Sequence, residues 1–237
     1  QVGSSAASDV YKRQLKNIAN IEAEPLLSLA SEDIEPKHWE QMATKVEEIH
    51  SEKNHGIIIG HGTDTMSYSA AALSFQLPEI SNPVIFTGSQ RSPDRPSSDA
   101  HLNLEGAAKA AMSDLGEISI AMHETTDDLN VAIWRGNRTR KNHSSKRDAF
   151  TSLNDEPIGI VSEKIEWKGK YRPTCEKTVI KSGFDEKIAL VWAHPGFNSG
   201  DWENVTSSKK GVVIAGTGLG HITVSYTHLT LPTILPV

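Results

Sequence analysis

The stretch from Gly56 to Phe75, GIIIGHGTDTMSYSAAALSF, decides the fold. The three isoleucines at 57–59 form a continuous apolar run, which is typical of a strand buried on both faces. The alanine-rich segment that follows predicts a helix over about 65–77. The polar turn GHGTD, residues 60–64, therefore stands where a strand ends and a helix begins. This order predicts an α/β unit with a polar turn at the carboxyl end of its sheet.

Elements of the same kind flank this stretch on both sides. Apolar residues recur at helical spacing after Pro36, a residue type that favours the first turn of a helix. Apolar strands that alternate with helices predict an α/β fold with a parallel sheet covered by helices on both faces. The predicted elements are helices over 35–50 and near 98–113, the latter capped by Ser97 or Ser98, and strands at 83–86, 118–122 and 131–134.

The pattern changes after residue 160, where the regular alternation stops. Two further apolar strands, KIALVWAHPG and GVVIAGTGLG, indicate a second α/β unit. We predict an N-terminal domain over 15–162, a linker over 163–185 and the start of a smaller C-terminal α/β domain over 186–223. The linker is expected to contain a hairpin or an irregular turn at Lys168-Gly169.

The two ends of the chain, QVGSSAASDVYKRQ (1–14) and VSYTHLTLPTILPV (224–237), differ from the rest. Both resemble translated sequencing-adapter sequence; the alternative is a natural N-terminus and an ordinary C-terminal strand. We interpret both ends as artefact tails and leave them out of the fold prediction. We therefore expect the remainder to be a fragment, truncated at the start of its first domain and within its second.

Composition and charge exclude several classes of protein. Hydrophobic residues make up 37% of the 237 residues, and no apolar run approaches the length of a membrane span. Thirty acidic and 24 basic residues leave a net charge of -6, which argues against a protein that grips nucleic acid by itself. The single cysteine, Cys175, excludes an internal disulfide framework and favours a reducing, cytoplasmic location.

Thr63 and Asp64 stand at the carboxyl end of the first strand, where open parallel sheets bind ligands. Gly60 and Gly62 would allow another backbone to approach closely there. Thr and Asp are also common helix caps, so capping explains either residue without a catalytic role. Two such residues with two glycines exceed what a cap requires, but this motif alone leaves both interpretations open.

A second polar loop, TGSQRSPDRPSSD at 87–99, follows the next predicted strand. Because neighbouring parallel strands end at one edge of the sheet, two polar loops favour a composite pocket over two coincidental caps. Arg91, Arg95 and Asp99 are interpreted as a salt-bridge cluster that stiffens this loop.

The segment WRGNRTRKNHSSKRDAF, 134–150, carries six basic residues. Such a run indicates a solvated face or a nucleic-acid patch. Lys141 allows another interpretation, because a lysine beside a threonine hydroxyl and a carboxylate could take the hydroxyl proton or stabilise the alkoxide. Spacing alone does not choose among the six.

Three motifs together closely resemble the L-asparaginase/glutaminase family that uses a threonine nucleophile. They are GHGTDTM, TGSQRSPDRPSSDAHLN and RKNHSSKRDAF, in the family's order and spacing. SEDIEPKHW upstream and GVVIAGTGLGHI downstream resemble the family's substrate-binding turn and the glycine-rich strand end of its second domain. The resemblance covers almost all of 26–222 and implies the asparaginase-type α/β fold.

The resemblance also implies roles for individual residues. Thr63 resembles the second catalytic threonine, and Lys141 resembles the lysine of a Thr-Lys-Asp group. Asp64 would hold the substrate's α-amino group, and Phe150 lies at the family's distance after Lys141. The implied substrate-binding residues are Ser31 for the α-carboxylate, Glu32 for the ammonium group and Ser89, whose backbone carbonyl would meet the leaving amide.

The chemistry implied by the family is acyl transfer. A threonine oxygen attacks the side-chain amide of glutamine or asparagine, ammonia leaves, and water releases the acid. The family's first threonine, in a Thr-Gly-Gly-Thr-Ile type of motif, and its tyrosine loop have no counterpart in 15–30. The chain as given is therefore expected to have no turnover.

Within the family, SEDIEPKHW, RTRKNHSSKRDAF, YRP and GTGLGHI resemble the D subunits of archaeal glutamyl-tRNA(Gln) amidotransferases more than free-standing asparaginases. This resemblance implies a homodimer bound to an E subunit, which uses ATP and Mg, makes most of the tRNA contact and receives the ammonia. It implies no cofactor in this chain and no membrane. The alternatives are a stand-alone cytosolic L-asparaginase and a non-catalytic amino-acid-binding module.

The histidines carry no metal pattern. His61, His101, His123, His143 and His194 lack the clustered spacing of metal ligands, and each is interpreted as a surface or hydrogen-bonded histidine. GTGLGH, 216–221, lacks the full pattern of a nucleotide loop. We therefore expect neither a metal nor a bound nucleotide in this chain.

Overall fold

The computed structural model describes residue 15, residues 18–49 and residues 56–222. The predicted tails, 1–14 and 224–237, lie outside the described residues. The chain divides into two compact units, Gln1–Ser182 and Gly183–Val237, and each is described by itself. In the described part, no helix is long and apolar enough to cross a membrane.

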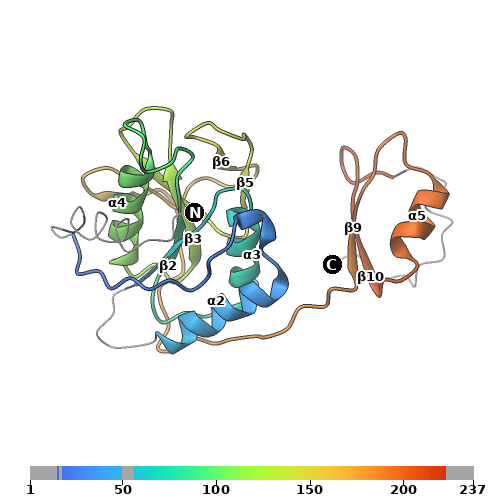
Figure 1. Ribbon diagram of the computed structural model, residues 1–237, viewed down its shortest axis with the longest axis horizontal. Coiled ribbons are helices and arrows are strands. Elements are labelled where there is room, and N and C mark those ends of the chain that lie inside the picture. The colour runs from blue at the N-terminus through green and yellow to red at the C-terminus, as the bar shows by residue number, and fades with distance from the viewer. Residues whose placement is uncertain (1–14, 16–17, 50–55, 223–237) are drawn as a thin grey trace. The chain divides into compact units, whose positions relative to one another are not determined.

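The first unit is built on a six-stranded sheet in the order β1-β2-β3-β4-β7-β8 (Figure 1). Its strands are β1 (Ile57–Gly60), β2 (Val84–Thr87), β3 (Ile118–His123), β4 (Val131–Arg135), β7 (Gly159–Val161) and β8 (Ile165–Trp167). The strands predicted from the apolar runs at 56–60, 83–86, 118–122 and 131–134 are all present, within a residue or two of their predicted bounds. The α/β class is therefore confirmed.

The sheet is parallel only over its first three strands. β1 pairs with β2, and β2 with β3, in parallel, but β4 runs antiparallel to β3. A parallel neighbour needs a crossover of about a dozen residues or more. The connection from β3 to β4 spans only 124–130, so the chain turns back on itself. The sheet is therefore parallel from β1 to β3 and antiparallel from β3 to β8. The pattern of apolar runs did not indicate this change of direction.

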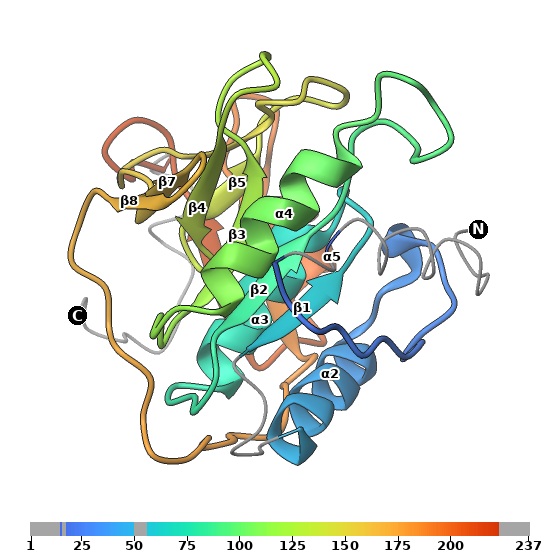
Figure 2. The same cartoon turned by 90° about the vertical axis from the view of Figure 1, so that its left-hand side faces the viewer.

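Helices cover both faces of the sheet, as predicted. α2 (Pro36–Glu48) and α3 (Met66–Gln76) pack on one face, and α4 (Ala100–Ala111) packs on the other (Figures 1 and 2). Alternate residues of β2 point to opposite faces: Phe86 joins the cluster under α3, and Ile85 the cluster under α4. Both faces of β2 are thus buried, which explains its unbroken apolar sequence.

The helix starts agree with the sequence at α2 and differ at α4. Pro36 is the first residue of α2, behind a capping box between Glu35 and His38. α4 begins after Asp99, so neither Ser97 nor Ser98 is its N-cap residue. Ser98 still accepts a hydrogen bond from the amide of Ala100, at 3.2 Å. The Asp99 carboxylate makes no cap bond because it is used elsewhere, as described below.

The segment predicted as a linker, 163–185, begins inside the sheet. Residues 165–167 form β8, which pairs with β7 in a hairpin that turns at 162–164 and not at Lys168-Gly169. The chain then runs along the first unit, where Pro173 bridges to Leu115 and Val179 bridges to Glu79. Backbone pairing holds these residues to the first unit, which extends to Ser182.

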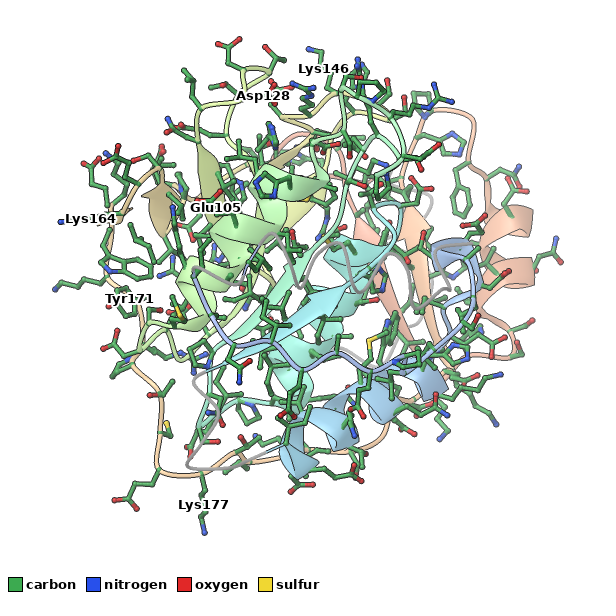
Figure 3. All side chains as sticks on the ribbon, turned by 60° about the vertical axis from the view of Figure 1, so that its left-hand side comes forward. Glu105, Asp128, Lys146, Lys164, Tyr171 and Lys177 are labelled. Carbon is green, nitrogen blue, oxygen red and sulfur yellow. The ribbon has the colours of Figure 1, made fainter. Side chains whose placement is uncertain are left out.

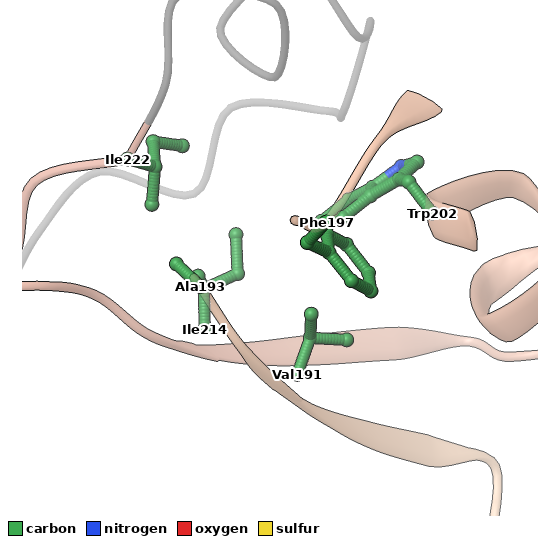
Figure 4. A pocket seen from close by; sticks show the side chains of 6 residues that line it. All are labelled: Val191, Ala193, Phe197, Trp202, Ile214 and Ile222. Carbon is green, nitrogen blue, oxygen red and sulfur yellow. The ribbon is translucent and has the colours of Figure 1, made fainter. Parts of the chain in front are cut away.

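The second unit contains β9 (Ile188–Trp192), α5 (Ser199–Thr206) and β10 (Gly211–Ala215). The two strands pair in parallel, and Trp202 of α5 packs on Ala189 and Val191. Val191, Phe197 and Trp202 border an apolar gap of about 10 Å³, which barely admits one water molecule (Figure 4). This gap is a packing defect and not a ligand site.

The contact between α4 and β4 depends on a glycine. A Cβ atom at Gly106 would lie 2.7 Å from the Cβ of Val131, which is closer than real side chains approach. We expect Gly106→Ala to lower the free energy of unfolding by about 1–3 kcal/mol, because overpacking outweighs the better helix propensity of alanine. Urea unfolding followed by circular dichroism would measure this change. The control His101→Ala, at an exposed position of the same helix, should stay within about 0.5 kcal/mol, and a Gly106→Ala variant as stable as the parent would contradict the packing described here.

Candidate active site

Thr63 and Asp64 lie in the turn between β1 and α3, at the carboxyl end of the parallel strands. Neither residue caps the helix. The N-cap residue of α3 is Thr65, whose side chain makes no cap bond and donates instead to the carbonyl oxygen of Ser31, at 2.6 Å. Capping therefore does not account for the Thr-Asp pair.

Lys141 brings the two residues into one cluster. Its Nζ donates to Thr63 Oγ1 at 2.8 Å and to Asp64 Oδ1 at 2.6 Å. The Lys141 side chain is only 10% exposed, whereas that of Asp64 is 69% exposed. Of the six basic residues at 134–150, Lys141 is thus the one that meets the hydroxyl and the carboxylate, a choice that sequence spacing could not make.

A short hairpin positions Lys141. β5 (Thr139–Lys141) pairs with β6 (Phe150–Ser152), and Lys141 lies opposite Phe150. Phe150 is 1% exposed and belongs to the core under α3. The buried Phe150 side chain anchors the hairpin at the edge of the sheet. The spacing of nine residues between Lys141 and Phe150 is the spacing that places them opposite each other in this hairpin.

The donor geometry indicates what this cluster can do. A lysine ammonium group only donates hydrogen bonds, so the Thr63 hydroxyl must direct its own hydrogen away from Lys141. The Thr63 oxygen is held against a positive charge, and negative charge developing on that oxygen would be stabilised. Asp64 balances the charge of the amine from the solvent side. Such a group suits proton transfer to or from an oxygen nucleophile.

Ser31 also lies at this turn. It begins a short 3-10 helix, η1 (Ser31–Asp33), and a Cβ atom at Gly62 would lie 2.8 Å from its Oγ. The missing side chain of Gly62 therefore makes room for the Ser31 hydroxyl one residue before Thr63. Glu32 is exposed in the same 3-10 helix, and the structure gives it no contact with the cluster.

Ser89 follows Gly88, a position where close packing leaves no room for a side chain. A Cβ atom at Gly88 would lie 2.4 Å from the carbonyl oxygen of His61 and 3.5 Å from the methyl group of Thr63. Asn103 of α4 donates to the Gly88 carbonyl at 2.9 Å and fixes this backbone. The loop that carries Ser89 is thus held beside the Thr63 turn, so two successive strand ends contribute to one site.

The loop 87–99 is stiffened, but not by the predicted salt bridges. Asp99 is 1% exposed, and its carboxylate accepts hydrogen bonds from the backbone amides of Gln90 and Arg91, both at 2.9 Å. Within the described residues, neither Arg91 nor Arg95 forms an ion pair with Asp99. Backbone amides satisfy a buried carboxylate without requiring a long cationic side chain to be buried with it.

A chain of hydrogen bonds supports the turn from behind, and no motif in the sequence indicated it. Trp39 Nε1 donates to Ser69 Oγ at 2.9 Å, and Ser69 Oγ lies 2.9 Å from His61 Nε2. His61 Nδ1 lies 2.7 Å from the carbonyl oxygen of Gly62, so Nδ1 carries the hydrogen and Nε2 accepts from Ser69. His61 is therefore a hydrogen-bonded histidine that orients the backbone before Thr63. Burial lowers its pKa, and the bond to Gly62 opposes this change in part.

Arg135, another basic residue of the 134–150 segment, has its partners outside this cluster. Arg135 bonds to Glu117 and Asp155, both at 2.8 Å, and holds strand ends together. Among the described residues, no three His, Cys, Asp or Glu side chains lie close enough to hold a metal ion.

Comparison with known proteins shows the family of the chain. The sequence pattern of a family described as "Asparaginase, N-terminal" matches residues 2–173. The chain belongs to the asparaginase family. The match includes residues 2–14, so the interpretation of that end as an artefact stays a prediction.

Several curated relatives carry one description, the D subunit of a glutamyl-tRNA(Gln) amidotransferase. The relative from Thermoplasma volcanium is 41% identical over 209 residues, which cover 88% of this chain and 51% of the relative. The protein of the same description from Pyrococcus furiosus is 44% identical over 213 residues, which cover 88% and 49%. The chain thus spans about half the length of the curated relatives it matches.

A solved structure shows the same fold. The thermostable L-asparaginase from Thermococcus kodakarensis superimposes with a TM-score of 0.80 at 29% identity, over 92% of this chain and 65% of that one. The asparaginase-type fold predicted from the three motifs is therefore confirmed, whereas the roles of individual site residues stay predictions.

His61 predicts a pH dependence of stability. Because burial lowers its folded-state pKa below the ordinary value of 6.5, the unfolded chain binds the proton first as the pH falls. Its contribution to stability is complete above about pH 6.5 and declines below it, by at most about 1.4 kcal/mol per pH unit. We expect the stability difference between the parent and His61→Gln to shrink between pH 7.5 and 5.5 in urea unfolding. An unchanged difference would refute this, and His101→Gln, at an exposed position, is the control.

Proposed function

We propose that this chain carries the Thr63, Asp64 and Lys141 part of the amide-hydrolysing site of a glutamyl-tRNA(Gln) amidotransferase, whose full gene product releases ammonia from glutamine, or from asparagine. The observation that carries the proposal is the contact of Lys141 Nζ with Thr63 Oγ1 and Asp64 Oδ1, at 2.8 Å and 2.6 Å. A threonine hydroxyl beside a largely buried amine is one arrangement in which an adjacent group activates an oxygen nucleophile.

The reaction would proceed by acyl transfer. A threonine oxygen adds to the side-chain amide carbon, the carbon–nitrogen bond breaks, and the nitrogen leaves as ammonia after receiving a proton. Water then cleaves the ester, so that glutamine and water yield glutamate and ammonia. Lys141 and Thr63 would move the proton between the attacking hydroxyl and the leaving nitrogen, and the charge of Lys141 would stabilise the intervening alkoxide.

The surrounding residues would bind the amino-acid end of the substrate. Asp64 is exposed and anionic, and its carboxylate has acceptor positions besides the one used by Lys141, so it suits an α-ammonium group. Ser31 would donate to the α-carboxylate, and Glu32 would add negative charge on the ammonium side. The backbone carbonyl of Ser89 would accept from the departing amide, on a loop that Asn103 holds in place.

The partners follow from the relatives named as amidotransferase D subunits. We propose a homodimer that binds an E subunit in the cytoplasm, with ATP and Mg used by that partner and no cofactor held in this chain. The ammonia would convert Glu-tRNA(Gln) to Gln-tRNA(Gln) on the E subunit.

A stand-alone L-asparaginase is the second candidate, because the superimposed Thermococcus kodakarensis structure carries that description. Both candidates use the same cluster of Thr63, Asp64 and Lys141. A non-catalytic amino-acid-binding module would keep the substrate contacts but gain nothing from an amine placed on Thr63. The amine contact therefore favours the two enzymes over the binding module.

The catalytic cluster predicts the effect of two substitutions in the full gene product. Thr63→Val removes the hydroxyl and Lys141→Ala removes the amine, so each should lower ammonia release from glutamine at least about 100-fold. Coupled glutamate dehydrogenase assays would measure the release, with circular dichroism to verify folding. Thr63→Ser keeps the hydroxyl and should retain activity within about tenfold, and Lys177→Ala, at an exposed position, should leave it unchanged. Near-normal activity of Thr63→Val or Lys141→Ala would exclude the proposed roles.

The choice between the two enzymes is tested by adding the partner. We expect the full gene product to hydrolyse glutamine slowly alone, and faster with an archaeal E subunit, ATP, Mg and Glu-tRNA(Gln), because ammonia is useful only when an acceptor is present. Formation of glutamate in quenched reactions measures both rates, because the transamidation consumes the ammonia. Efficient hydrolysis of asparagine alone, with no response to the partner mixture, would instead identify a stand-alone asparaginase.

A further inference from the structure

A basic hollow lies among the loops of the first unit, and the amide-hydrolysing site does not use it. Arg91, Thr126, Ser145, Lys146 and Arg147 line this hollow, which is open to solvent and has a volume of about 390 Å³. The residues come from three loops, 88–99, 124–130 and 142–149, that are far apart in the sequence. Three cations and two hydroxyl groups therefore gather at one place on a chain whose net charge is -6.

Two of the three cations have no carboxylate partner among the described residues. In that part of the chain, the Arg91 guanidinium bonds only to the Ser97 hydroxyl, at 2.8 Å, and no ion pair of Lys146 is found. Both side chains belong to exposed residues. Asp94 and Asp127 lie in the neighbouring loops but do not line the hollow. The charge of Arg91 and Lys146 is thus available to a ligand.

The third cation, Arg147, is fixed in place. It donates to Asp128 at 2.7 Å and to the carbonyl oxygen of Ser97 at 2.7 Å, and its side chain is 16% exposed. Gln90 also donates to the carbonyl oxygen of Lys146, at 2.8 Å. These bonds tie the loop of Arg91 to the loop of Lys146, so the hollow is a built feature and not a chance meeting of flexible side chains.

The acid that pairs with Arg147 also bonds a buried histidine. His123 is fully buried, with Nδ1 at 2.6 Å from Asn103 Oδ1 and Nε2 at 3.1 Å from Asp128 Oδ1. The Asn103 amide is oriented by its Nδ2, which donates to the Gly88 carbonyl and to Asp99. Both ring nitrogens of His123 are thus engaged by hydrogen-bond partners.

Asp128 is thus engaged by both His123 and Arg147. The His123 hydrogen bond, assisted by Arg147, lowers the pKa of Asp128 and keeps it ionised. One carboxylate cannot cancel the three positive charges of Arg91, Lys146 and Arg147. The hollow therefore carries a net positive charge.

The lining also indicates which kind of anion fits. No aromatic side chain lines the hollow, so a base or sugar ring would find no surface on which to stack. Arginine and lysine side chains with neighbouring hydroxyl groups match the oxygens of phosphate groups. A hollow that is open to solvent suits a polymer that passes over it better than a small molecule that must be enclosed.

We propose that Arg91, Lys146 and Arg147 form a contact site for the phosphate backbone of RNA, through which this chain itself holds tRNA. The identity of the RNA as tRNA rests on the proposed amidotransferase function. The contact would be independent of base sequence and weak by itself, and it would add to the tRNA contact of the E subunit. It would also give a role to two basic residues of the 134–150 segment that the amide-hydrolysing site leaves unused.

The test compares two double variants of this chain that lose the same charge. Arg91→Ser with Lys146→Ser removes the two exposed cations of the hollow, and Lys164→Ser with Lys177→Ser removes two exposed cations elsewhere. Figure 3 shows Lys164 and Lys177 well away from Lys146. Binding of a fluorescently labelled tRNA(Gln) transcript is followed by fluorescence anisotropy between 50 and 200 mM KCl.

Each lost phosphate contact should lower the slope of log affinity against log salt by about 1. The slope for the hollow variant should therefore be smaller than that of the parent by about 2. Between 50 and 200 mM KCl, a fourfold rise, the affinity of the variant should thus fall about 16-fold less than that of the parent. The control variant should keep the parent slope. Equal slopes for both variants, or no binding of RNA by the parent chain, would overturn the proposal. Binding of poly-glutamate that is lost in the hollow variant alone, while RNA binding is unchanged, would also overturn it and identify an acidic protein partner.

The outcome is separable from that of the proposed function. Ammonia release is measured without RNA, and RNA binding is measured without glutamine. RNA binding through the hollow by a protein that releases no ammonia would remove the proposed function and leave the RNA contact standing. Ammonia release together with RNA binding that is unchanged in the hollow variant would leave the proposed function standing and remove the RNA contact at the hollow.

Discussion

The site depends on one constraint: an amine must be largely shielded from solvent at the edge of the sheet, yet remain bonded to two oxygens. Lys141 meets this constraint because its Nζ finds Thr63 and Asp64 within 2.8 Å while its side chain stays 10% exposed. A buried amine without such partners would be costly, and a solvated amine would have little effect on a threonine hydroxyl. The sheet, the hairpin and the glycines around the turn all serve this placement.

Three separate parts of the chain create that geometry. The parallel strands bring the turn after β1 and the loop after β2 to the same edge, where Gly88 allows them to touch. The β5–β6 hairpin reaches this edge from a distant part of the sequence, anchored by Phe150. Behind the turn, Trp39, Ser69 and His61 form a chain of hydrogen bonds that fixes the backbone before Thr63. Rigid positioning of this kind is what a proton-transferring group requires.

The polar network extends from the site to the basic hollow. Asn103 bonds both the backbone of Gly88, beside the candidate active site, and the ring of His123, which in turn bonds Asp128 and so Arg147. A contact at the hollow is thereby connected through hydrogen-bonded side chains to the loop that carries Ser89.

The sequence by itself determined α2, α3, α4 and the apolar strands β1 to β4, β9 and β10, because local periodicity and end signals are properties of neighbouring residues. The apolar run at 57–59, Pro36 before α2 and the alanine-rich α3 all predicted what the structure contains. It also supplied Thr63, Asp64 and Lys141 as candidates through the resemblance of three motifs. Only the tertiary structure decided the antiparallel return of β4, the pairing of residues 165–167 with β7 and the use of Asp99 on backbone amides. It also showed that Lys141 contacts Thr63 and Asp64, and it joined the loop of Arg91 to that of Lys146, because contacts between residues about 50 to 80 positions apart depend on how the chain crosses in space.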